Sequence, residues 1–146
     1  RAVRIEIPET FSFAVVCPNF ELLTTQMRAL LPNYYSRTDA VFNLQRATLL
    51  VAALATGNQQ VFPEVLADRL HQPYRLAKVP GMEAIVKLRA PGLLGCTLSG
   101  SGPAILVFFK TGAEAVVDLV NATFQSAGYS SEVFFTSVDH CGLKIM

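Results

Sequence analysis

The order in which strand-like and helix-like patterns follow one another constrains this chain more than any other feature. From Phe11 onward the apolar spacing indicates a strand, a long helical stretch, two strands, a helix and a strand. This is the split βαβ order, βαββαβ, which is typical of an antiparallel sheet with helices on one face. We therefore expect an α+β fold, a two-layer ferredoxin-like sandwich, with a long helical insertion between the first and second core strands.

The expected elements follow from apolar alternation, helical spacing and turn residues. The predicted strands are residues 3–7, 11–18, 93–98, 104–109 and 130–138, with a short final strand over 141–146. The predicted helices are residues 24–31, 39–57, 61–70, 81–92 and 112–128, with a broken stretch over 71–81. Thr24 or Thr25 would cap the first helix, while Asp39 and Gly57 would cap the two ends of the second.

Composition excludes several classes of protein. The 146 residues suit one domain, and 51% of them are hydrophobic, which is enough to fill a core. The net charge of +1 and the scattered basic residues give no nucleic-acid footprint, and no apolar run is long enough to span a membrane. The first residues do not have the pattern of a signal peptide, and Cys17, Cys96 and Cys141 are spaced for neither a disulfide framework nor a zinc site. We expect buried reduced thiols and a cytoplasmic location.

The loop between the two middle strands, Ser99–Pro103, consists of small residues only. Five such residues are more than a plain hairpin turn needs. Gly100 and Gly102 can adopt positive φ and leave backbone N–H groups uncovered, and successive N–H groups form a nest that attracts anions. A mobile hairpin loop fits the same pattern. The loop lacks the GxxxxGK[ST] pattern of a Walker loop, and a strand rather than a helix follows it.

Two arginines are candidate ligands for a carboxylate or a phosphate. Arg28 lies in the first short helix, and Arg75 lies in a stretch interrupted by prolines. The planar guanidinium group suits these anions because it binds two oxygens at once. A solvated surface position or a helix-end cation is the alternative for each.

The other polar residues indicate neither a metal site nor a nucleophilic triad. His71 and His140 are far apart and have no acidic partner at metal-ligand spacing, so a surface or capping role is expected for both. Asp68 could form a local charge pair with Arg69.

Four segments resemble the C-terminal half of the homoserine kinase family, which belongs to the GHMP small-molecule kinase superfamily. The segment "LLGCTLSGSGPAILVFF" resembles the third conserved motif of the superfamily. The other three resemble segments of homoserine kinases: "CPNFELLTTQMRALLP", "DRLHQPYRLAKVPG" and the long inserted helix "YYSRTDAVFNLQRATLLVAALATG". The resemblance covers about residues 10–110.

This resemblance implies that residues 1–146 are a GHMP-kinase C-terminal domain without its N-terminal ATP-binding domain. The family transfers the γ-phosphoryl group of ATP, with Mg²⁺, to the side-chain hydroxyl of L-homoserine in threonine biosynthesis. Arg28 and Arg75 match the arginines that hold the amino-acid carboxylate. The loop beside the nucleotide phosphates is matched by four residues, which are Ser99, Gly100, Ser101 and Gly102. One departure is Ala104, where the superfamily often has Thr.

The resemblance also implies that half of the active site is missing. The family's phosphate-binding loop, of the type PxxxGLGSSA, and its magnesium-site acidic residue lie in the N-terminal domain, and nothing like that loop occurs here. We therefore expect ATP and Mg²⁺ to be bound mainly by the missing domain. We expect no catalytic residue in this fragment, and no activity from it alone.

Three other functions remain open. The full-length protein could be a GHMP kinase for another small alcohol, although an acceptor without a carboxylate has little use for two arginines. An amino-acid-binding regulatory module shares the βαββαβ order, but such modules are usually near half this length. A structural domain that dimerises is the third, and a homodimer is compatible with the kinase interpretation as well.

Overall fold

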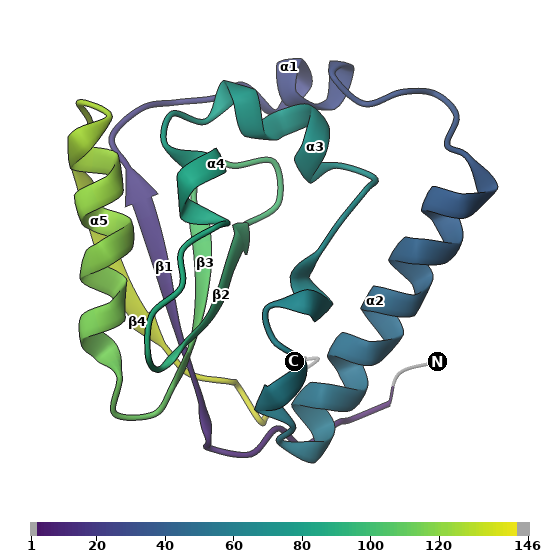
Figure 1. The fold of residues 1–146 in the computed structure, drawn as a ribbon, viewed down its shortest axis with the longest axis vertical. Coiled ribbons are helices and arrows are strands. Elements are labelled where there is room, and N and C mark those ends of the chain that lie inside the picture. The colour runs from purple at the N-terminus through teal and green to yellow at the C-terminus, as the bar shows by residue number, and fades with distance from the viewer. Residues whose placement is uncertain (1–2, 143–146) are drawn as a thin grey trace.

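The computed structural model describes residues 3–142 and contains a four-stranded antiparallel sheet (Figure 1). Its strands are β1 (Phe11–Pro18), β2 (Leu93–Leu98), β3 (Ile105–Lys110) and β4 (Ser131–Thr136). They lie in the order β2-β3-β1-β4, and every neighbouring pair is antiparallel. The nearly all-apolar β1 is a central strand, and the βαββαβ order is confirmed.

Four helices fill the connection between β1 and β2, and one joins β3 to β4. The helices are α1 (Thr24–Ala29), α2 (Arg37–Thr56), α3 (Gln72–Arg75), α4 (Met82–Ile85) and α5 (Val117–Ser126). Single 3₁₀ turns occur at Gln59–Val61, Glu64–Leu66, Leu76–Lys78 and Glu114–Val116. In Figure 1, α5 runs along the sheet, whereas the long α2 stands apart from it on the other side of the molecule. The long helical insertion expected between the first two core strands is therefore present.

The main core lies between one face of the sheet and helices α4 and α5. Its fully buried members include Val16, Met82, Ile85, Ile105, Val107, Phe109, Val120 and Phe124. Because successive strand residues point to opposite faces, Phe11 and Phe108 lie on the other face, where they pack against Phe62 and Leu66 of the insertion. The insertion thus covers part of the face that a two-layer arrangement with helices on one side would leave bare.

Several expected elements are shorter or absent. Residues 3–7 form no strand, because alternation produces a strand only where another strand can pair with it, and Val3 is 86% exposed. The helix predicted over 61–70 is replaced by two 3₁₀ turns around Pro63, which has no N–H to donate. Of the helix predicted over 81–92, only α4 forms. Residues 141 and 142 are not in a strand, and the rest of the final predicted strand lies outside the described residues.

The helix caps differ from the predicted ones at two of three places. The residue before α1 is Leu23, which makes no side-chain cap bond, so neither threonine caps this helix. Ser36 caps α2: its Oγ accepts from the Asp39 N–H at 3.0 Å and donates to the Asp39 carboxylate at 2.6 Å. Gly57 ends α2 in the left-handed conformation, as predicted.

The outer face of α2 is apolar and exposed. Leu44 is 68% exposed, Val41 and Val51 are also exposed, and Ala53 is the helix's one buried residue. Helical periodicity therefore identified this helix without identifying what it packs against. Among the described residues, no helix has both the length and the hydrophobicity that crossing a membrane requires.

The three cysteines are free thiols in different surroundings. Cys96 is buried, and burial raises the pKa of its thiol to about 12, which keeps it protonated and unreactive. Cys17 is half-buried, and Cys141 is exposed. The expectation of buried thiols is therefore confirmed for Cys96, is met only in part for Cys17 and is wrong for Cys141, which follows the last strand.

Candidate functional site

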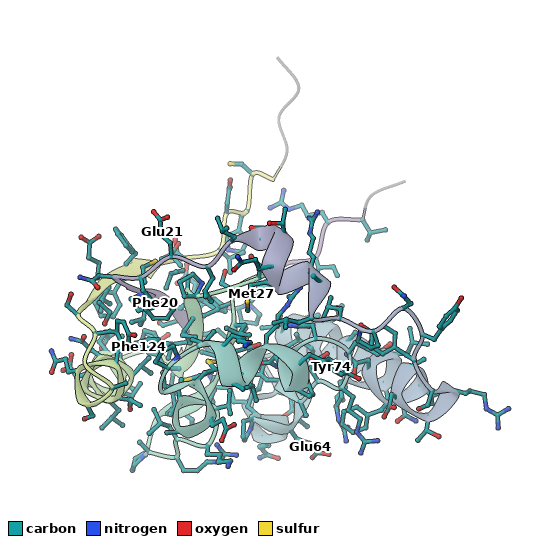
Figure 2. The ribbon with its side chains drawn as sticks, turned by 90° about the horizontal axis from the view of Figure 1, so that it is seen from above. Phe20, Glu21, Met27, Glu64, Tyr74 and Phe124 are labelled. Carbon is teal, nitrogen blue, oxygen red and sulfur yellow. The ribbon has the colours of Figure 1, made fainter. Side chains whose placement is uncertain are left out.

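The segments that the sequence singles out meet at one end of the sheet. Helices α1 and α3 lie together at this end, and Figure 2 looks onto it with Met27 of α1 and Tyr74 of α3 labelled. The Arg75 Nε–H donates to the Met27 carbonyl at 3.3 Å, and Nη1–H donates to the Gly100 carbonyl at 3.1 Å. Arg75 therefore contacts both the small-residue loop and the helix that carries Arg28.

Asp68 holds the start of α3 in place. Its carboxylate accepts hydrogen bonds from four groups, the Asn43 side chain of α2 and the backbone N–H groups of Leu70, His71 and Gln72. Burial by itself raises the pKa of Asp68, but these hydrogen bonds outweigh it, and the net pKa lies below the ordinary value. The predicted pair with Arg69 is wrong, because Arg69 instead donates to Asp39 at 3.4 Å.

An Asp68→Asn variant should lose about 2 to 4 kcal/mol of stability at neutral pH, since an amide replaces a charged acceptor of several hydrogen bonds. The lowered pKa means that this contribution is present above pH 3.8 and is lost as the pH falls through the pKa of the folded state. Denaturation midpoints of both proteins should therefore differ at neutral pH and converge in acid. The exposed Glu132→Gln change is the control, with an expected effect below about 0.5 kcal/mol.

Gln72 connects α3 to the end of β2. Its Nε2 donates to the Leu66 carbonyl at 3.2 Å, and its Oε1 accepts from the Leu98 N–H at 3.4 Å. Leu98 directly precedes the small-residue loop, so this buried amide fixes where the loop begins. Sequence reasoning missed Gln72, because a glutamine in a polar stretch is usually exposed and nothing local marks it as buried.

The loop is closed at its base and open at its tip. The Ser99 N–H donates to the Ala104 carbonyl at 2.8 Å, and the Gly102 N–H donates to the Ser99 carbonyl at 3.1 Å. Gly100 and Gly102 have φ values of 63° and 82°, which glycine adopts without strain. Within residues 3–142, the N–H groups of Gly100 and Ser101 have no protein acceptor. Two neighbouring N–H groups of this kind can bind an anion.

The two arginines differ in their surroundings. Arg28 is exposed and makes no ion pair or side-chain hydrogen bond with any described residue. Arg75 is only 7% exposed and has donated two of its five N–H groups to carbonyls. The hydroxyls of Thr24 and Ser101 lie 3.4 Å apart, a second contact between α1 and the loop. Among the residues that the structure describes, this end of the domain therefore combines the unpaired guanidinium group of Arg28, the partly bonded one of Arg75 and two N–H groups without an acceptor.

His71 does not take the capping role considered for it, whereas His140 lies at the surface as expected. His71 precedes α3 but its side chain makes no cap bond, because Asp68 serves that purpose. Burial and then the charge of Arg75 lower the pKa of His71, while Asp68 raises it, and the net shift is downward. His71 is consequently neutral at neutral pH, and His140 is exposed. Within residues 3–142, no three His, Cys, Asp or Glu side chains are grouped so that they could hold a metal ion.

This chain belongs to the GHMP kinase family. The family's C-terminal domain model, "GHMP kinases C terminal", matches residues 47–126. Curated relatives include the homoserine kinase of Solibacter usitatus (strain Ellin6076), which is 55% identical over 145 residues, or 99% of this chain and 48% of that protein. The homoserine kinase of Caldicellulosiruptor bescii is 44% identical over 71% of this chain and 34% of that protein.

A solved structure has the same fold. The crystal structure of homoserine kinase from Cytophaga hutchinsonii matches with a TM-score of 0.86 at 25% identity, over 93% of this chain and 44% of that one. These findings confirm the resemblance to the homoserine kinase family. The chain spans about half the length, or less, of the relatives it matches.

Proposed function

We propose that residues 1–146 form the C-terminal domain of a homoserine kinase and contribute half of its active site. The observation that carries this proposal is that Arg75 contacts both the loop and α1, the helix that carries Arg28, in a domain whose curated relatives are homoserine kinases. The full-length protein would transfer the γ-phosphoryl group of ATP to the side-chain hydroxyl of L-homoserine, as in threonine biosynthesis. Such a biosynthetic kinase would act in the cytoplasm.

In this proposal the two arginines bind the amino acid through its carboxylate. Arg28 is exposed and its guanidinium group bonds to no described residue, so it can form the paired N–H···O contacts that a carboxylate favours. Arg75 contributes the N–H groups that it does not donate to backbone carbonyls. Together they would orient the acceptor hydroxyl, and in phosphoryl transfer such positioning supplies a large part of the rate.

The loop fits a nucleotide phosphate for a separate reason. The unpaired N–H groups of Gly100 and Ser101 can donate to a phosphate oxygen, and an added Cβ at Gly100 would meet nothing within 4 Å, so the tip has room for a ligand. ATP would supply the phosphoryl group when bound there. No described group of acidic side chains fits Mg²⁺, so we assign the metal to the N-terminal domain. A homodimer also stays a prediction.

Arg28→Ala in the full-length protein should raise the KM for L-homoserine roughly 30- to 100-fold, because a charge-assisted contact worth about 2 to 3 kcal/mol is lost. The KM for ATP should change little. Steady-state kinetics with each substrate varied in turn would measure both, with the exposed Arg37→Ala as the control. An unchanged KM for homoserine, or equal use of an alcohol that lacks the carboxylate, would favour a kinase for another small alcohol.

A further inference from the structure

We infer that Arg75 is a positioning residue that fixes the phosphate-side loop relative to the acceptor-side helix, and so couples the two halves of this site. This inference rests on the proposed function for its catalytic consequence. Its structural part rests on the two hydrogen bonds of the Arg75 guanidinium group alone.

The guanidinium group of Arg75 donates hydrogen bonds to backbone carbonyls and pairs with no charged side chain among the described residues. It is buried, and no acidic side chain within residues 3–142 forms a salt bridge with it. Burying an unpaired charge is costly unless hydrogen bonds compensate it. The two carbonyls that compensate it belong to segments 48 and 25 residues away along the chain. A contact of this kind joins segments that local structure alone would leave independent.

The two carbonyls that Arg75 bonds belong to Met27 and Gly100, which directly precede Arg28 and Ser101, two residues assigned to ligand binding. The Gly100 carbonyl shares its peptide plane with the Ser101 N–H, and the Met27 carbonyl shares its plane with the Arg28 N–H. In a planar trans peptide the C=O and N–H groups point in opposite directions. By holding the Gly100 carbonyl, Arg75 therefore aims the Ser101 N–H away from itself, toward the open side of the loop.

The shape of the guanidinium group allows both functions at once. Arginine has five N–H donors in one rigid plane, and three remain after the two backbone bonds. A carboxylate bound by the remaining donors would restrain the same plane that orients the loop. Lysine keeps the charge but has a single nitrogen on a flexible stem, so it cannot hold two fixed carbonyls in this way.

The test compares Arg75→Lys with Arg28→Lys in the full-length protein, because both keep the charge and only Arg75 holds the loop. Without substrates, Arg75→Lys should speed amide hydrogen exchange at Gly102 by at least about tenfold, and Arg28→Lys should leave it unchanged. In kinetics, Arg75→Lys should lower kcat at least about tenfold and raise the KM for both substrates, while Arg28→Lys should affect mainly the KM for homoserine.

Equal loop exchange in both variants, with only the KM for homoserine raised, would overturn the inference. If the protein lacks homoserine kinase activity, the proposed function fails, and the exchange experiment still decides whether Arg75 holds the loop. A measurement on the unmodified protein covers the case in which Arg75→Lys does not fold. The Nε–H of Arg75 should then exchange at least about tenfold more slowly than that of Arg28, and equal rates would contradict the two hydrogen bonds.

Discussion

Residues 1–146 expressed alone should form ADP from ATP and L-homoserine at less than about a thousandth of the rate of the full-length protein. In the proposed function, this domain supplies acceptor contacts and one phosphate-side loop, and the second phosphate-binding loop and the magnesium ligands belong to the N-terminal domain. Phosphoryl transfer depends on holding both reactants and neutralising charge. A domain that contains only half of the positioning groups should therefore have almost no catalytic activity.

A coupled assay for ADP measures this directly. Circular dichroism of the isolated domain should first show that it is folded, and the full-length protein prepared in parallel is the matched control. Turnover near the full-length rate would refute the half-site proposal. Tight binding of an amino acid by the isolated domain, without any turnover in the full-length protein, would instead support a regulatory module.

Ser101→Leu should reduce the activity of the full-length protein at least about 100-fold while lowering its stability by less than about 1 kcal/mol. Ser101 is a half-buried residue at the tip of the loop, and its hydroxyl lies 3.4 Å from that of the exposed Thr24. A leucine there loses this contact but replaces no member of the buried core. It would, however, occupy the space in which the open N–H groups would meet a phosphate.

The matched variant is Ser101→Ala, which removes the contact with Thr24 but stays small. It should retain activity within about tenfold, because the N–H groups and the space both remain. Thermal unfolding and steady-state kinetics of the two variants distinguish the effect of losing the hydroxyl group from the effect of filling the space at the loop tip. Full activity of Ser101→Leu would contradict the placement of the loop against a phosphate.

Patterns local in sequence predicted much of this domain correctly. The strand pair around the loop, the central β1, helix α5 and the Gly57 end of α2 all follow from apolar spacing and glycine chemistry. Those signals act over a few residues, so a single sequence contains them. Arg28, Arg75 and the loop were identified as candidate binding groups from residue chemistry and a family resemblance. Their binding roles stay predictions.

Features that depend on distant partners were missed. The strand predicted at residues 3–7 lacks a neighbour, and the apolar spacing of α2 marks a helix whose outer face meets no described part of the chain. Asp68 was expected to pair with Arg69, its neighbour in sequence, but the start of α3 offers three backbone donors and α2 a fourth. A group of well-placed donors stabilises a carboxylate more than one exposed cation does.

Apolar spacing and residue chemistry were enough to specify the order of strands and helices, the small-residue loop and the types of residue able to bind anions. The packing of the whole chain was needed to bring Arg75 to the carbonyls of Met27 and Gly100, and Gln72 to the N–H of Leu98 at the end of β2. The physical reason is that a buried hydrogen-bonding group takes whichever partner the packed chain brings within reach. That partner is set by packing across the whole domain, which the neighbouring residues in sequence do not specify.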